Sequence, residues 1–160
     1  LSLPAALPSL FSNCDSLQSI TIPDSVTSIG GYAFKDCTSL REIRIPDIAN
    51  ICPGAFENCL SLQKVSLPSS ISNIYSKSFK DCRLLSDVNF GHKSSSSWST
   101  VMVYPRVFEN CESLKTLEIY QGYIDNKAFI NCSNLKTIYN HYRWHDDKKF
   151  EKCDAKVIYL

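Results

Sequence analysis

The chain has 160 residues, of which 44% are hydrophobic and 21% are charged, a composition typical of a soluble globular domain. Lys and Arg number 17 and Asp and Glu 16, so no charge excess favours DNA, RNA or an anionic membrane as partner. No apolar run approaches the roughly 18 residues that a membrane-spanning helix needs, so we expect no transmembrane segment in this chain.

The first residues, Leu1 to Pro4, carry no starting Met, basic n-region or apolar h-region. They match only the end of a strand in the repeat described below. We therefore expect a single domain over residues 1–160 that is a fragment of a longer repeat protein and begins inside a repeat.

A unit of about 22 residues recurs along the chain, and each copy places a cysteine three residues after a phenylalanine. The seven pairs are Phe11 and Cys14, Phe34 and Cys37, Phe56 and Cys59, Phe79 and Cys82, Phe108 and Cys111, Phe129 and Cys132, and Phe150 and Cys153. Successive cysteines of this series lie 23, 22, 23, 29, 21 and 21 residues apart. Recurrence in register at such a period is the signature of a repeat architecture.

Apolar residues follow each pair at fixed positions. A leucine stands three residues after six of the cysteines: Leu17, Leu40, Leu62, Leu85, Leu114 and Leu135. Two alternate apolar positions come next, as in Ile43 and Ile45, and this period of two predicts a short, half-buried strand. Pro23, Pro46 and Pro68 follow the first three strands and mark their ends, because proline cannot donate to a strand ladder.

Between the strands we expect two further elements. The spacing of three in Phe-x-x-Cys-x-x-Leu suits one turn of α- or 3₁₀-helix. An Asn or Asp precedes six of the cysteines, and we expect its side chain to bond nearby backbone N–H groups. Residues 25–29 and 70–74 return the chain and are candidates for a second short strand.

One unit cannot bury its own apolar side, whereas stacked units share a continuous core. We therefore predict an α/β solenoid of about seven coils of 21–23 residues, one of them enlarged to 29, with a parallel sheet and short helical turns. Residues 91–103 are the expected inserted loop in the fourth coil, a serine-rich stretch that contains Trp98.

The motif Phe-x-Asn-Cys-x-Ser-Leu-x-x-Ile-x-Ile-Pro, nearly complete from Phe11 to Ala33 and again from Phe56 to Phe79, resembles the BspA-type leucine-rich repeat. The resemblance covers almost the whole chain. It implies a right-handed leucine-rich-repeat superhelix of the kind found in large surface or secreted proteins that adhere to host or matrix proteins. It specifies the fold but not the partner.

The C-terminal coils depart from the pattern. Lys156 stands where the seventh leucine is expected, and the last strand is predicted near residues 157–160. Asn140 occupies a position that is apolar in the earlier coils, so we expect either a bend in the strand there or a buried partner for its side chain.

The seven in-series cysteines are predicted to form a buried column of reduced, unreactive thiols, since equivalent positions of a solenoid point the same way. A column does not converge four ligands on one zinc ion, and it gives poor geometry for disulfides. We therefore expect no metal and no cofactor. Cys52 is out of series, and Cys52 and Cys153 are the thiols expected to be accessible.

Catalytic motifs are scarce. His141 and His145, followed by Asp146 and Asp147, have a spacing that could hold a metal on a helix, but Tyr142 stands where a zinc protease motif needs Glu. In repeat phase this stretch is a polar connection between a strand and Phe150. No Gly-x-Ser-x-Gly elbow or glycine-rich phosphate loop is present, so we predict that the chain is not an enzyme.

Residues that alternate with the buried positions of each strand must face outward and form two ladders. The first reads Thr21, Arg44, Ser66, Asn89, Glu118 and Tyr139, and the second reads Ser19, Glu42, Lys64, Asp87, Thr116 and Thr137. A second candidate contact is Trp98 in the insertion. A third is an aromatic cluster near the C-terminus, which could stack on a sugar ring or a protein loop: Tyr120, Tyr123, Tyr139, Tyr142 and Trp144.

We interpret the chain as a non-catalytic interaction module that binds a protein, and the resemblance implies an adhesive role at the cell surface or in a secreted protein. A structural spacer within a larger surface protein is the alternative, and carbohydrate binding through the aromatic cluster is another. The outward residues of the ladders could also serve only to keep the surface solvated.

Overall fold

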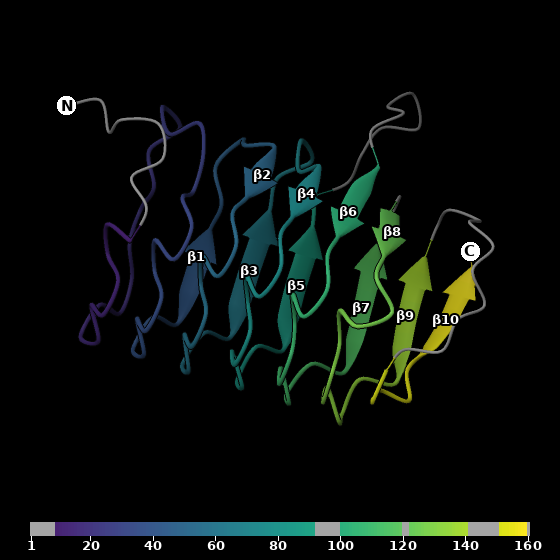
Figure 1. Cartoon of the computed structure of the whole chain (residues 1–160). Coiled ribbons are helices and arrows are strands. Elements are labelled where there is room, and N and C mark those ends of the chain that lie inside the picture. The colour runs from purple at the N-terminus through teal and green to yellow at the C-terminus, as the bar shows by residue number, and fades with distance from the viewer. Residues whose placement is uncertain (1–8, 92–99, 120–121, 141–150, 160) are drawn as a thin grey trace.

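A computed structural model of the chain describes residues 9–91, 100–119, 122–140 and 151–159. In this part of the chain the backbone winds into a stack of coils that each run from one sheet to the other (Figure 1). The larger sheet contains six parallel strands: β1 (Glu42–Arg44), β3 (Lys64–Leu67), β5 (Asp87–Phe90), β7 (Thr116–Ile119), β9 (Thr137–Asn140) and β10 (Lys156–Tyr159). The smaller sheet contains four parallel strands: β2 (Asn50–Ile51), β4 (Asn73–Ile74), β6 (Val101–Val103) and β8 (Gly122–Ile124).

Four consecutive coils contribute a strand to both sheets, which confirms the predicted solenoid with a parallel sheet. The predicted return strand is also confirmed, since β4 lies within residues 70–74 and Ile29 forms a bridge to Ile51. Of the expected insertion, residues 92–99 lie outside the described part of the chain, and Val101–Val103 form β6.

The register of the larger sheet places equivalent repeat positions side by side. Ile43 pairs with Val65, which pairs with Val88, and Leu117 pairs with Ile138. These side chains are buried, and they face Ile51, Ile74 and Val103 of the smaller sheet across the core. Because side chains alternate between the two faces of a strand, this register directs every intervening residue outward.

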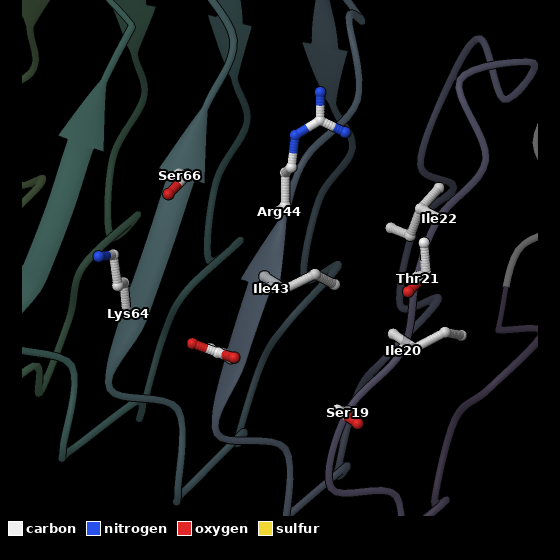
Figure 2. A pocket seen from close by; sticks show the side chains of 9 residues that line it. Ser19, Ile20, Thr21, Ile22, Ile43, Arg44, Lys64 and Ser66 are labelled. Carbon is white, nitrogen blue, oxygen red and sulfur yellow. The ribbon is translucent and has the colours of Figure 1, made fainter.

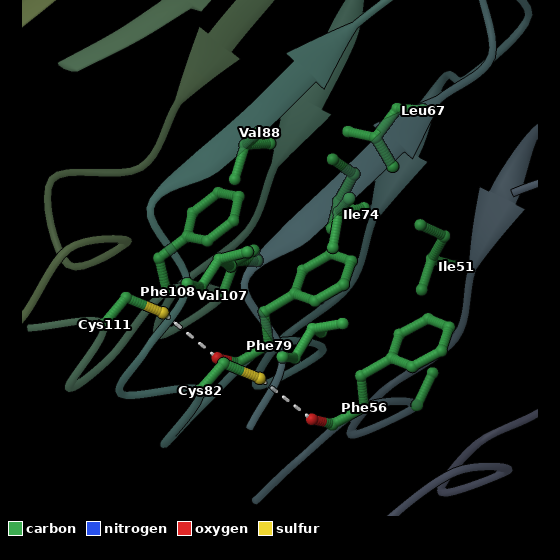
Figure 3. Close-up of a cluster of buried hydrophobic side chains, with 14 of the residues drawn as sticks. Ile51, Phe56, Leu67, Ile74, Phe79, Cys82, Val88, Val107, Phe108 and Cys111 are labelled. Atoms are coloured by element: carbon green, nitrogen blue, oxygen red, sulfur yellow. Dashed lines mark hydrogen bonds between the residues drawn. The ribbon is translucent and has the colours of Figure 1, made fainter. Parts of the chain in front are cut away.

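A column of stacked phenylalanine rings fills the core on the turn side of the sheets (Figure 3). Neighbouring rings from Phe11 to Phe129 lie 5.1–5.6 Å apart between centroids and within 8° of parallel. The centroid distances exceed the roughly 3.5–4.0 Å at which carbon atoms make contact, so the nearly parallel rings are offset from one another, as aromatic stacking prefers. Each coil therefore covers the phenylalanine of its neighbour.

The expected helical turn is not confirmed, because the described residues contain no helix. The Phe-x-x-Cys segment instead forms successive four-residue turns. The N–H of Cys37 donates to the carbonyl of Phe34, and the N–H of Leu40 donates to the carbonyl of Cys37. The residue before each in-series cysteine has a φ of 53–64°, in the left-handed region, as do Tyr32 and Lys77 earlier in their turns. A left-handed residue every few positions interrupts a helix and suits the third position of a type II turn.

The Asn or Asp before six of the seven in-series cysteines has a different role from the one predicted. These residues adopt the left-handed conformation more readily than most others. Their side chains bond one another between coils: Asn58 Nδ2 donates to Asp36 Oδ1 at 2.7 Å, and Asn110 Nδ2 donates to Asp81 Oδ1 at 2.6 Å. Asn131 Nδ2 continues the second run by donating to Asn110 Oδ1 at 3.0 Å.

The turns are also joined through their backbones. Phe34 N–H donates to Ala55 carbonyl at 2.8 Å, Phe56 N–H to Ser78 carbonyl at 2.8 Å, and later coils repeat the pattern. These bonds satisfy backbone groups that would otherwise be buried without partners in an irregular segment. The stack is therefore hydrogen-bonded on three sides, by two sheets and one column of turns.

At the C-terminal end, β10 begins three residues after Cys153, whereas β9 begins five residues after Cys132. The last coil is two residues shorter there, which explains why Lys156 aligns with the outward Thr137 and not with a buried leucine. Asn140 is buried and remains in the regular strand β9, paired with Ile119 on one side and Tyr159 on the other. Of the two alternatives expected at Asn140, a bend or a buried partner, the bend is not observed.

Replacing Phe79 by Ala should lower the free energy of unfolding by about 3–5 kcal/mol, because the ring is fully buried between Phe56 and Phe108 and its removal leaves a cavity. Urea unfolding followed by circular dichroism measures the change. Leu84→Ala is the control, since the Leu84 side chain is 49% exposed and its loss should cost less than about 0.5 kcal/mol. Equal losses for the two variants would contradict the assignment of Phe79 to the core.

Two substitutions at Asn110 distinguish the contribution of its left-handed backbone to stability from the contribution of its side-chain hydrogen bond. Gly adopts the observed φ of 61° without steric cost, whereas Ala does not, and both lack the amide that bonds Asp81. Asn110→Ala should therefore be less stable than Asn110→Gly by about 1 kcal/mol in urea unfolding. An Ala variant as stable as the Gly variant would be inconsistent with a left-handed residue at this position.

Candidate interaction surface

The outer face of the larger sheet consists of two ladders of side chains that lie in register. One ladder joins Arg44, Ser66, Asn89, Glu118 and Tyr139. The other contains Glu42, Lys64 and Asp87, and further along the stack Thr116 and Thr137. We call these ten residues the sheet face. Seven are exposed, and Ser66, Thr137 and Tyr139 are half-buried.

The charged residues of the sheet face take part in weak ion pairs. Lys64 Nζ lies 3.7 Å from Asp87 Oδ2, and Arg44 Nη1 lies 3.4 Å from Asp24 Oδ1. All four side chains are more than half exposed, and exposed pairs of this kind contribute at most about 1 kcal/mol. A partner could therefore exchange these pairs for its own at small cost.

A groove of about 440 Å³ lies at the N-terminal end of the sheet face, between residues 19–22 and β1 (Figure 2). We call it the β1 groove. Its volume falls within the range of ligand-binding clefts. Its walls are Ser19, Ile20, Thr21, Ile22, Glu42, Ile43, Arg44, Lys64 and Ser66.

The β1 groove exists because the first predicted strand does not join the sheet. Residues 19–22 follow the same Ile-x-Ile-Pro pattern as β1, yet they are not a strand, and β1 is the terminal strand of the described sheet. We expected the two ladders of the sheet to include Ser19 and Thr21. This prediction is wrong, because residues 19–22 do not form a strand of the sheet. Both residues are exposed and line the groove from the opposite wall.

A third outward position was missed from the sequence. Gln18, Arg41 and Gln63 directly precede the strand positions, are exposed, and line an adjoining hollow of about 420 Å³ with Ser19, Glu42 and Lys64. The signal was present, because a polar residue stands four positions after the cysteine in every unit from Cys14 to Cys132.

The other predicted contact residues are mostly outside the described part of the chain. This holds for Trp98, Tyr120, Tyr142 and Trp144, and also for the histidines at 92, 141 and 145. Tyr123 is described, but it lies on β8 in the smaller sheet, away from the sheet face. Tyr139 is therefore the member of the aromatic cluster that the structure places on the sheet face, beside Glu118 and the exposed Ile158 of β10.

The cysteine column lies beneath the turns and joins each coil to the one before it (Figure 3). The thiol of Cys82 donates to the carbonyl of Phe56 at 3.2 Å, and the thiol of Cys111 donates to Phe79 at the same distance. Cys37, Cys59 and Cys132 make the equivalent bond at 3.1, 3.2 and 2.9 Å. Burial raises the pKa of Cys37 and of Cys132 to about 12 and raises the pKa of Cys111 as well.

The column is shorter than predicted. Cys37, Cys59, Cys82, Cys111 and Cys132 are buried, and Cys52 and Cys153 are partly exposed. Cys14 is exposed, which is a correction to the expected buried column of seven. All eight cysteines are free, and the described residues contain no group of His, Cys, Asp or Glu side chains arranged to hold a metal ion.

Stacked coils with a continuous parallel sheet and recurring Leu, Ile, Phe and Cys inside define a leucine-rich-repeat solenoid. The chain belongs to the BspA type leucine rich repeat family, whose repeat region matches it in six copies over residues 8–136 and 99–160.

Solved structures have the same fold. The chain is similar to the T. pallidum Leucine Rich Repeat protein with a TM-score of 0.62 and 24% identity, over 71% of this chain and 52% of that one. It is also similar to a leucine rich cell surface protein from Faecalibacterium prausnitzii, with a TM-score of 0.56 and 25% identity, over 82% and 50% of the two chains. The chain thus spans about half the length of these proteins. No curated protein matches it significantly.

In the native protein a thiol reagent should modify Cys14, Cys52 and Cys153 and spare the five buried cysteines. At pH 8 a thiol with a pKa of about 12 is ionised in only about one molecule in ten thousand, and the thiolate is the reactive form. Mass spectrometry of peptides after brief labelling measures this, with labelling in urea as the control for full reactivity. Rapid native modification of Cys82 or Cys111 would overturn the buried column.

Proposed function

We propose that this chain is a non-catalytic interaction module that binds a partner protein through its sheet face. The observation that supports the proposal is the contrast between the two sides of the same strands. The inward positions carry Ile, Val or Leu except at Phe90 and Asn140, while the outward positions change in charge, size and polarity from coil to coil. A constant scaffold with a varied, extended outer sheet is the usual contact surface of solenoid proteins.

We further propose that the protein acts in adhesion at a cell surface or after secretion, with a host or matrix protein as partner. Family membership and the similarity to the F. prausnitzii protein, which is named a cell surface protein, favour this location. In the described residues no helix is long and apolar enough to cross a membrane. We also propose that the whole chain forms one right-handed domain of seven coils, one for each Phe-x-x-Cys unit.

Binding to an array of purified matrix proteins and glycans tests the proposal, with a triple variant that changes the sheet face. Arg44→Ala, Glu118→Ala and Tyr139→Ala together should weaken binding to any array hit at least tenfold, because they remove a cation, an anion and an aromatic ring from one ladder. Surface plasmon resonance gives the affinities, and thermal unfolding checks that the variant remains folded.

The matched control removes a cation, an anion and a tyrosine away from the sheet face. It combines Lys127→Ala, Asp47→Ala and Tyr123→Ala, all exposed positions outside the strands of the larger sheet. This control should bind as the unmodified protein does. An array without a hit would favour a structural spacer instead, and equal losses in the two triple variants would contradict the sheet face as the contact surface.

A further inference from the structure

Ion pairs between adjacent coils follow one rule along most of the stack. A cation of one coil lies beside a carboxylate of an adjacent coil, as in Lys64 with Asp87 at 3.7 Å and Lys80 with Glu109 at 3.6 Å. The other pairs of this kind are Lys35 with Glu57, Arg44 with Asp24, Arg83 with Glu112, and Lys127 with Glu151. Opposite charges on neighbouring strands stabilise a sheet, whereas like charges there destabilise it.

Three lysines depart from this rule at the C-terminal end of the larger sheet. Lys115, Lys136 and Lys156 lie on consecutive coils, and all three side chains are exposed. The N–H of Lys136 donates to the carbonyl of Lys115 at 3.0 Å, and the N–H of Lys156 donates to the carbonyl of Lys136 at 2.9 Å. Among the described residues no carboxylate forms an ion pair with these lysines, and Lys136 Nζ instead donates to the carbonyl of Ser133 at 3.3 Å. Like charges are therefore neighbours here.

The three lysines border the outer face of the larger sheet. Lys115 and Lys136 directly precede the outward Thr116 and Thr137. In the first three coils, the residues at this repeat position line the hollow that adjoins the β1 groove, beside outward strand residues. Lys156 pairs with Thr137 in the strand register, so it belongs to the outer face itself. All three ammonium groups are thus available to a ligand that lies on this end of the sheet.

An apolar pair lies beside the lysines on the same face. Ile158 pairs with Tyr139 in the strand register, and its side chain is 42% exposed. Ile158 follows Lys156 by two residues on β10, so both side chains point to the same side of the sheet. We call Lys115, Lys136, Lys156, Tyr139 and Ile158 the lysine patch.

A ligand that supplies carboxylates gains more at the lysine patch than elsewhere on the larger sheet. At Arg44 or Lys64, a partner's carboxylate must replace an ion pair that already exists. At the three lysines it replaces only water and counter-ions, and it relieves the repulsion between neighbouring cations. A partner's apolar side chain can also cover Ile158. Protein segments carry carboxylates and aliphatic side chains together, whereas anionic glycans have no aliphatic side chains.

We propose that the lysine patch binds an acidic segment of the partner protein, with Asp or Glu carboxylates on the three lysines and an apolar side chain over Ile158 and Tyr139. This inference rests on the proposed binding function and assigns the chemistry of its partner. The backbones of neighbouring lysines lie about 4.8 Å apart by the spacing of paired strands, and same-face residues of an extended peptide lie about 6.6 Å apart. The flexible lysine side chains span this difference.

Fluorescence anisotropy with labelled twelve-residue peptides tests the chemistry of the ligand. One peptide contains only Glu and Ser, a second has Leu at two of the serines, and a third has Gln at every Glu of the second. The Glu–Leu peptide should bind most tightly, the Glu–Ser peptide about threefold more weakly and the Gln–Leu peptide at least about tenfold more weakly. Equal binding of the Glu–Leu and Gln–Leu peptides would overturn the proposal.

Two triple variants with the same loss of charge test the location of the site. Lys115→Gln, Lys136→Gln and Lys156→Gln together should weaken the Glu–Leu peptide at least about tenfold. The control combines Lys35→Gln, Lys77→Gln and Lys127→Gln, which lie outside the strands of the larger sheet, and should change the affinity less than about twofold. Thermal unfolding checks that both variants are folded. Equal weakening in the two variants would mean that the peptide responds to net charge alone, and it would overturn the lysine patch.

A single substitution tests the apolar part of the patch. Ile158→Thr keeps a β-branched residue in β10 and removes apolar area, so the variant should bind the Glu–Leu and Glu–Ser peptides equally. An unchanged preference for the Glu–Leu peptide would contradict the contact with Ile158.

A heparin-derived oligosaccharide is the competing probe. If the lysine variant loses this oligosaccharide but retains the Glu–Leu peptide, the patch binds an anionic glycan and the proposal is wrong. The peptide measurements need no array partner, so the two proposals can fail independently. An array partner that the sheet-face triple variant loses and the lysine variant retains would support the binding function and overturn the lysine patch as its contact.

Discussion

The carbonyl of each buried phenylalanine holds two coils together, and the rest of the architecture depends on that junction. The Phe79 carbonyl accepts the N–H of Cys82 in its own turn and the thiol of Cys111 in the next coil. The cysteine is small enough to pack in the core and still supplies a weak donor to a buried acceptor. Because ring stacking and the thiol bond recur at the same positions, each coil accepts only a neighbour of the same shape.

This junction explains why the turns are not helical and why the outer surface is free to vary. The left-handed residue before each cysteine turns the chain so that Phe and Cys both enter the core and the backbone groups of the turn face the adjacent coils. The distance between adjacent turns then sets the distance between neighbouring strands in both sheets. Outward residues such as Asn89 and Glu118 contribute little to this packing, so their chemistry can be adapted to a partner.

Much of this could be predicted from the repeat alone, because a residue type that recurs in register must occupy one environment. The parallel sheet, the buried Phe and Leu columns and the outward ladders follow from periods of two and of about 22. The left-handed turns could not be predicted from spacing, since Tyr32 and Lys77 adopt a conformation that their residue types do not favour. The β1 groove was also hidden, because Ile20-x-Ile22-Pro23 matches the coils that do pair. Cys14 is exposed although it shares its residue type and its spacing from Phe11 with the buried cysteines, so these two features do not by themselves determine burial.

Each coil stabilises only its direct neighbours through the phenylalanine column, and a pair of double-mutant cycles measures this coupling. The first cycle combines Phe56→Leu with Phe79→Leu, whose rings are stacked at 5.2 Å, and the second combines Phe34→Leu with Phe108→Leu, which are separated by two coils. We predict a coupling energy of about 0.5–1.5 kcal/mol in the first cycle and none beyond about 0.3–0.5 kcal/mol in the second. Equal coupling in both cycles, or none in the first, would show that the stacked rings do not couple adjacent coils.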